Sequence, residues 1–150
     1  MKDIHHHKIL ILDFGSQYTQ LIARRIREIG VYCEILPHSV DPTRIEQFHP
    51  NGIILSGGPE TVTMATTPRI PENIFSLEVP VLGICYGMQA IAKQLGGEVS
   101  SSQKREFGHS DLTVINQSPL FQNLEVSKLK VWRSQGAKVP GLPNGFSLLA

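Results

Sequence analysis

The chain has 150 residues, of which 41% are hydrophobic and 18% charged, and its formal net charge is +1. This length and composition suit one globular domain with a single core, and the balanced charge gives no preference for nucleic acid or an anionic membrane. No apolar run approaches the ~18 residues of a membrane-spanning helix, so we expect a cytoplasmic protein with neither nucleic-acid nor membrane partners.

Strands and helices alternate along the first two thirds of the chain. Short apolar segments bounded by turn residues predict buried strands, and the segments between them predict helices. The strands are expected at residues 9–14, 31–36, 52–55 and 79–84, and the helices at residues 16–29, 42–48, 73–77 and 87–95. This alternation predicts an α/β fold with a doubly wound, mostly parallel sheet.

The pattern changes after Gly97. Further strands are expected at residues 98–100, 112–115, 128–132 and 146–149, in a more antiparallel extension of the fold. The chain therefore stops inside a predicted strand, where a domain seldom ends. We expect the sheet to be incomplete at its C-terminus.

The strand-to-helix junction at residues 83–87 reads Gly-Ile-Cys-Tyr-Gly. A Gly two residues on either side of a nucleophile lets strand and helix pack closely around a strained turn, as in the Gly-x-Ser-x-Gly elbow of serine hydrolases. Cys85 would lie at a helix N-terminus, where unpaired N–H groups and the helix dipole favour the thiolate. The alternative is a small buried core residue, which needs neither glycine. We predict that Cys85 is a nucleophile.

The other candidate metal or redox residues form no pattern. Cys33 lies in an apolar strand segment and is interpreted as structural, because two cysteines are too few for a disulfide framework. His5, His6 and His7 are adjacent, but no further ligand cluster accompanies them. We expect no metal site.

Four segments carry a family resemblance: residues 11–18 (Ile-Leu-Asp-Phe-Gly-Ser-Gln-Tyr), 52–60 (Gly-Ile-Ile-Leu-Ser-Gly-Gly-Pro-Glu), 83–89 (Gly-Ile-Cys-Tyr-Gly-Met-Gln) and 106–108 (Glu-Phe-Gly). They resemble the glutaminase domain of class I glutamine amidotransferases. The Gly-Gly-Pro loop and the Cys elbow mark the whole class, while residues 13–18 point to its GMP synthetase branch. The resemblance runs from about residue 4 to the end of the chain and implies a flavodoxin-like fold.

The resemblance also implies a site. Cys85 would attack the carboxamide carbon of L-glutamine, expel ammonia and leave a glutamyl thioester that water hydrolyses. By the family's pattern, the backbone N–H groups of Gly58 and Tyr86 bind the oxyanion, and Gly57 and Gln89 bind the substrate. A side chain at either glycine would obstruct close approach of the backbone to a ligand. The alternatives are an ordinary strand-ending turn at the two glycines and a solvated glutamine on the helix.

Three residues of the first motif keep open interpretations. Asp13 ends a strand at the sheet edge where α/β proteins bind ligands, but capping of the following helix explains it equally well. Gln17 and Tyr18 belong to the branch motif, and either packing or contact with another domain would account for them. None of the three is assigned a chemical role.

The chain departs from the family in two places. The activating His and orienting Glu belong to a Phe-His-Pro-Glu type motif far beyond the Cys, and no such motif occurs among the 150 residues. His38, His49 and His109 lack a following Pro-Glu and are interpreted as surface residues. The second departure is at residues 134–137, where Gln135 and Ala137 replace a His and an Asp of the family. We therefore expect residues 1–150 to be a partial, C-terminally truncated amidotransferase domain.

The GMP synthetase resemblance implies partners as well. An ATP-pyrophosphatase domain, which adenylates XMP and receives the ammonia, and a dimerisation domain are both absent from residues 1–150. No Ser-Gly-Gly-x-Asp-Ser type pyrophosphate loop is present. We expect a synthetase domain, in cis or in trans, to hold ATP and magnesium, and this chain to need no cofactor.

Three functional hypotheses remain open. The first is the glutaminase part of GMP synthetase, with Cys85 as its nucleophile. The second is an inactive fragment or pseudo-enzyme that at most binds glutamine or a partner domain, since the triad His and Glu are missing. The third is another cysteine hydrolase with the same elbow, against which Gln89 and residues 13–18 count.

Overall fold

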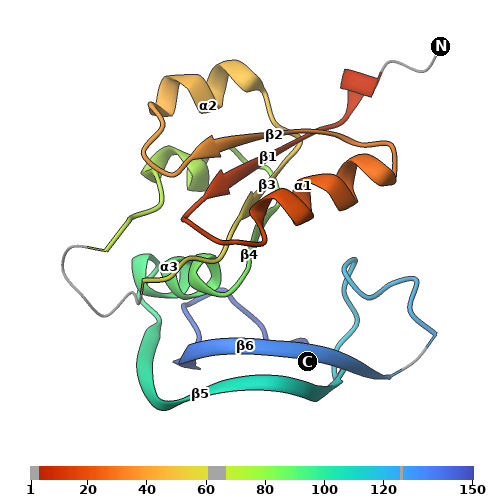
Figure 1. The fold of residues 1–150 in the computed structure, drawn as a ribbon, viewed down its shortest axis with the longest axis vertical. Coiled ribbons are helices and arrows are strands. Elements are labelled where there is room, and N and C mark those ends of the chain that lie inside the picture. The colour runs from red at the N-terminus through yellow and green to blue at the C-terminus, as the bar shows by residue number, and fades with distance from the viewer. Residues whose placement is uncertain (1–3, 61–66, 126) are drawn as a thin grey trace.

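A parallel sheet forms the centre of the molecule (Figure 1). The computed structural model describes residues 4–60, 67–125 and 127–150. The strands follow the order β2-β1-β3-β4, and every pairing in this sheet is parallel. Their bounds are β1 (Lys8–Asp13), β2 (Tyr32–Pro37), β3 (Gly52–Leu55) and β4 (Val81–Gly83). The predicted α/β fold class is confirmed.

Helices cover both faces of this sheet. Successive side chains of β1 point to opposite sides, and both sets are apolar, so each face must be buried against helices. Ile11 is fully buried in a cluster with Ala23 of α1 and Cys33 of β2. Leu10 and Leu12 are fully buried in a second cluster that includes residues of the other helices. The helical elements are η1 (Ile4–His6), α1 (Thr19–Glu28), α2 (Pro42–Phe48), η2 (Glu72–Ser76) and α3 (Tyr86–Gln94).

Most predicted elements lie close to their expected positions. The helix at 42–48 begins after Asp41, whose carboxylate accepts the N–H of Thr43 at 2.8 Å. The helix expected from residue 16 begins only at Thr19, because Gly15 has φ +94° and residues 17 and 18 form a turn. The segment expected to be helical at 73–77 is a 3-10 helix, η2.

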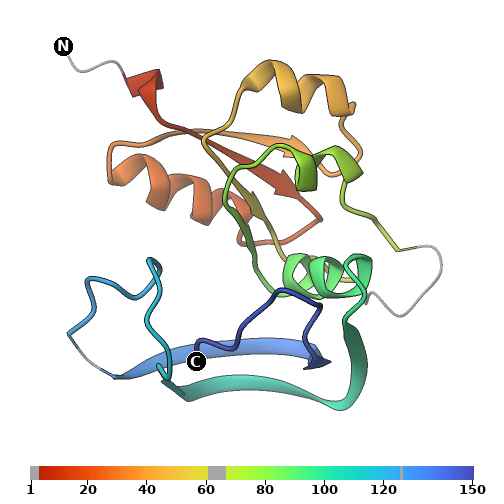
Figure 2. The same cartoon turned by 180° about the vertical axis from the view of Figure 1, so that it is seen from behind.

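A separate antiparallel ribbon follows α3. It consists of β5 (Glu98–Thr113) and β6 (Lys128–Gly141), and Figures 1 and 2 show it apart from the sheet, on the side where α3 lies. The antiparallel extension is thus confirmed, but the two short strands expected at 98–100 and 112–115 are one long strand ending at Thr113. Pairing with β6, interrupted by register shifts, keeps the intervening polar residues extended.

The strand predicted at residues 146–149 is wrong. This segment is irregular and follows a turn in which Gly145 has φ +85°. Among the described residues, the carbonyl of Leu149 alone in this segment accepts backbone N–H groups, from Ile115 at 2.8 Å and from Asn116 at 3.2 Å. A strand needs alternate residues to pair along a ladder, which a single accepting carbonyl does not provide.

Structural roles account for several residues that could have carried other functions. Cys33 is buried, and its thiol donates to the carbonyl of Ala23 at 3.4 Å, in agreement with the structural interpretation. In the described ranges no group of three or more His, Cys, Asp or Glu side chains could hold a metal ion. The same ranges contain no helix with the length and apolarity to cross a bilayer.

The parallel register brings three loops together. Leu12 of β1 is paired with Leu55 of β3, which is paired with Gly83 of β4. The segments that follow these residues therefore leave the sheet at the same carboxyl edge, which is where α/β proteins bind ligands.

Candidate active site

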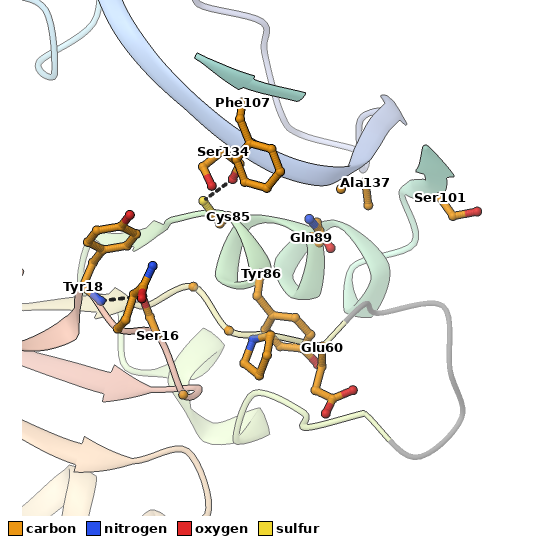
Figure 3. A pocket seen from close by; sticks show the side chains of 16 residues that line it. Ser16, Tyr18, Glu60, Cys85, Tyr86, Gln89, Ser101, Phe107, Ser134 and Ala137 are labelled. Atoms are coloured by element: carbon orange, nitrogen blue, oxygen red, sulfur yellow. Dashed lines mark hydrogen bonds between the residues drawn. The ribbon is translucent and has the colours of Figure 1, made fainter. Parts of the chain in front are cut away.

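A cavity of about 610 Å³ lies at the carboxyl edge of the sheet and extends to the ribbon (Figure 3). The loops after β1 and β3, the elbow before α3, and residues of β5 and β6 all contribute to it. Its lining residues are Gly15, Ser16, Gln17, Tyr18, Gly57, Gly58, Pro59, Glu60, Cys85, Tyr86, Gln89, Ser101, Phe107, Ser134, Gly136 and Ala137. All five residues predicted for the site are among them.

The elbow places Cys85 in strained backbone geometry. Cys85 has φ 50° and ψ −108°, and it immediately precedes α3. A Cβ on Gly83 would lie 2.7 Å from the backbone nitrogen of Met88, and a Cβ on Gly87 would collide with the carbonyl oxygen of Leu55. Both flanking glycines are therefore required by close strand-to-helix packing. The structure favours a nucleophile elbow over the alternative of an ordinary core cysteine.

The two glycines after β3 lie against the elbow and the first loop. A Cβ on Gly57 would lie 3.3 Å from the Cβ of Cys85, so a side chain there would crowd the sulfur, as the sequence led us to expect. A Cβ on Gly58 would collide with the carbonyl oxygen of Phe14. At Gly58 the need for glycine therefore comes from the close packing of the loop after β3 against the loop after β1, and not from obstruction of a ligand.

The N–H groups of Gly58 and Tyr86 are available to a ligand. Neither N–H donates a hydrogen bond to any other described residue. The ring of Tyr86 is buried, 5.3 Å from the ring of Phe14 between centroids, and its hydroxyl donates to the carbonyl of Pro68. This packing fixes the residue whose N–H begins α3, and a free N–H at a helix start is suited to binding developing negative charge.

Gln89 lies on the first turns of α3 and faces the cavity. The residue is 5% exposed, so the alternative of a solvated helix glutamine is wrong. Its Oε1 is buried without a hydrogen-bond partner among the described residues. A buried polar atom without a partner is costly, and a donor supplied by a ligand in the cavity would satisfy it.

The thiol of Cys85 is held by the ribbon. It donates to the carbonyl of Ser134 on β6 at 3.4 Å (Figure 3). Burial raises the pKa of the Cys85 thiol, whereas the position before α3 led us to expect a stabilised thiolate. Loss of water around the half-buried sulfur disfavours the charged form, and a carbonyl acceptor also favours the protonated thiol.

Alkylation of Cys85 by iodoacetamide should therefore be slow at neutral pH. Because the pKa is raised, the thiolate fraction at each pH is lower than for an ordinary cysteine, and the rate should rise through a midpoint above the ordinary ~8.5. Intact-mass kinetics from pH 6 to 10, with the Cys33→Ala variant to isolate Cys85, would measure it. A midpoint below the ordinary value would contradict the expectation.

Comparison with known proteins decides the family. A model of the family described as Glutamine amidotransferase class-I matches residues 10–150. The chain belongs to this family. It is a glutamine amidotransferase domain, as the resemblance of the sequence implied.

The relatives of this amidotransferase domain point to one branch. The GMP synthase [glutamine-hydrolyzing] of Tolumonas auensis is 56% identical over 156 residues, covering 99% of this chain and 30% of the relative. That of Coxiella burnetii is 58% identical over 157 residues, covering 100% of this chain and 30% of the relative. A solved structure of a candidate GMP synthase subunit from Thermoplasma acidophilum has TM-score 0.78 and 28% identity, covering 95% of this chain and 71% of that one. The chain is thus homologous to the glutaminase part of GMP synthase and spans about 30% of the length of these curated relatives.

No histidine lines the cavity of this amidotransferase domain in the described part of the chain. His38 lies over Phe14, with ring centroids 5.3 Å apart, and His109 packs edge-on against Trp132 at 5.0 Å. Glu60 is the lining carboxylate, and Figure 3 shows it beyond Tyr86, away from the thiol. A general base for Cys85 is therefore not found among the described residues.

The second sequence departure also falls at the cavity. Ser134, Gly136 and Ala137 of β6 line it, and Ala137 is 1% exposed. The side chain of Gln135 lies outside the described residues. The backbone of this segment thus reaches the pocket, although two of its residues depart from the family's pattern.

Residues of the first motif, 11–18, have two kinds of role: some hold the local structure and others line the cavity. Asp13 Oδ1 accepts the N–H of Gly15 at 2.9 Å and the hydroxyl of Thr19 at 2.8 Å, so it holds the turn before α1. Gln17 and Tyr18, whose role the sequence left open between packing and domain contact, also line the cavity. Sequence reasoning also gave no site role to Phe107, because only the folding back of the ribbon brings it to the cavity.

Proposed function

We propose that Cys85 is the nucleophile of a glutamine amidotransferase reaction. The sulfur attacks the carboxamide carbon of L-glutamine, ammonia leaves, and water hydrolyses the resulting glutamyl thioester. The N–H groups of Gly58 and Tyr86 bind the oxyanion of each tetrahedral intermediate. Gly57 allows close approach beside the sulfur, and Gln89 binds the substrate through its amide.

The observation that carries this proposal is the convergence of three groups in one cavity. The strained Cys85, the free N–H groups of Gly58 and Tyr86, and the partnerless Oε1 of Gln89 all belong to it. A carbonyl bound there would meet a nucleophile and preorganised donors, while a terminal amide or ammonium group of the same ligand would satisfy Gln89. The family membership supplies glutamine as the ligand that fits.

The proposal extends to the partner that uses the ammonia. Residues 1–150 form part of a glutamine amidotransferase domain, and a synthetase domain outside these residues aminates XMP to GMP with ATP and magnesium. The two cysteines are free, which suits the reducing cytoplasm as the place of the reaction.

Intact mass after incubation with 6-diazo-5-oxonorleucine, an electrophilic glutamine mimic, tests the proposal. We expect one adduct per chain, its formation slowed by free glutamine, because both ligands occupy the same cavity. The variant Cys85→Ser should give no adduct, and Cys33→Ala should label like the parent chain.

Two outcomes would count against a glutamine site. Labelling of Cys85 that excess glutamine leaves unchanged would indicate another cysteine hydrolase with the same elbow. No labelling of a chain that is folded by circular dichroism would leave the second hypothesis, an inactive partner-binding module. The described lining contains no histidine, and this observation favours the second hypothesis.

A further inference from the structure

Ser56 is a buried polar residue that connects all three loops of the site. It follows β3 and is 0% exposed. Its N–H donates to the carbonyl of Leu12 at 3.0 Å, and its own carbonyl accepts the N–H of Gly87 at 3.1 Å. These two bonds fix its backbone between β1 and the elbow helix.

The hydroxyl of Ser56 makes two further bonds from this fixed backbone. Its Oγ accepts the N–H of Phe14 at 2.9 Å, and its O–H donates to the carbonyl of Gly57 at 2.8 Å. Asp13 Oδ1 lies farther from the same Oγ, at 3.5 Å, and already accepts two other donors. The single hydroxyl proton therefore belongs to the Gly57 carbonyl.

The orientation of one peptide unit follows from this bond. A trans peptide points its C=O and its N–H in opposite directions, and no cis peptide occurs among the described residues. Holding the Gly57 carbonyl on Ser56 therefore directs the Gly58 N–H away from the buried hydroxyl, and both glycines line the cavity. A Gly-Gly peptide has little steric resistance to rotation, so its orientation needs such a restraint.

We propose that Ser56 is a positioning residue that holds the Gly57–Gly58 peptide with the Gly58 N–H directed at the oxyanion. This inference rests on the proposed role of that N–H. Ser56 does not line the cavity, so it acts only through the peptide that follows it. Without the hydroxyl, the peptide samples the opposite orientation, and only the fraction with the N–H inward binds the oxyanion.

An aldehyde analogue of glutamine, with –CHO in place of the carboxamide, tests this role. The Cys85 sulfur adds to the aldehyde carbon, the C=O π bond breaks, and the thiol proton ends on the oxygen of the hemithioacetal. We expect Ser56→Ala to weaken reversible aldehyde binding about tenfold, because the neutral hemithioacetal oxygen loses the hydrogen bond from the Gly58 N–H. This loss is smaller than the about 10²- to 10³-fold cost of losing a donor to a charged oxyanion. Alkylation by iodoacetamide should be unchanged, because it forms no oxyanion.

Matched variants separate positioning from stability. Ser56→Thr keeps the hydroxyl and should restore most of the aldehyde affinity. Ser76→Ala removes a hydroxyl that donates to the carbonyl of Asn73 at 2.8 Å, outside the cavity lining, and should leave the affinity at the parent value. Equal aldehyde affinity in Ser56→Ala and the parent, or an equal loss in Ser76→Ala, would overturn the inference.

A second measurement covers the case in which Ser56→Ala does not fold. In the parent chain labelled with ¹⁵N-glycine, the Gly58 amide resonance should move strongly when the aldehyde binds, while that of Gly30, which does not line the cavity, should stay in place. A stationary Gly58 resonance with aldehyde bound would overturn the inference. Failure of the parent to bind the aldehyde at all would instead overturn the proposed function, and this inference with it.

Discussion

A protein made of residues 1–150 is expected to hydrolyse glutamine at no more than about 0.1 per second. A typical enzyme turns over at about 10 per second, and a positioned general base contributes about 10²- to 10⁴-fold. The cavity lining in the described residues has no histidine, and burial raises the pKa of the Cys85 thiol. Ammonia release followed with a coupled glutamate dehydrogenase assay would measure the rate.

The control for this assay is Cys85→Ala, which should remove whatever slow turnover the parent chain shows. Labelling by the diazoketone should persist in the parent chain, since it needs the nucleophile and the cavity but not repeated turnover. An ordinary enzymatic rate that disappears in Cys85→Ala would contradict the prediction. It would mean that a base outside the described lining reaches the sulfur.

Alanine at Gly87 should destabilise the domain by about 3 kcal/mol or more. The added Cβ would collide with the carbonyl oxygen of Leu55 and lie 2.7 Å from the Leu55 Cβ, so strand β3 or helix α3 must move. For a chain of this length, that corresponds to a fall in Tm of roughly 6 to 12 °C. Thermal unfolding followed by circular dichroism would measure it, and diazoketone labelling should fall as well.

Gly30→Ala provides the matched control. Gly30 has φ +79°, and a Cβ added there would meet no heavy atom within 4 Å, so only backbone strain of about 1 to 2 kcal/mol is expected. Diazoketone labelling should remain at the parent rate in this variant. If Gly87→Ala and Gly30→Ala lost equal stability, crowding at the elbow would not be the reason that position 87 requires glycine.

The elements that followed from sequence are those with strong local signals. Strand β3 at 52–55 and helix α2 at 42–48 have the predicted bounds, because turn residues and the Asp41 cap define them locally. The ribbon was harder to predict. Strand β5 contains Gly108 and many polar residues, and its extended conformation depends on pairing with a segment that begins at Lys128.

The sequence by itself determined the elbow, since the glycines around Cys85 and the Gly57–Gly58 pair are needed wherever backbones approach this closely. Tertiary structure alone decided the state of the sulfur and the direction of the oxyanion donor. The Ser134 carbonyl reaches Cys85 only when the ribbon folds back, and Ser56 meets Phe14 and Gly87 only when parallel register aligns the strand ends. Such contacts join segments far apart in sequence, so burial and hydrogen-bond direction at the site are properties of the folded chain.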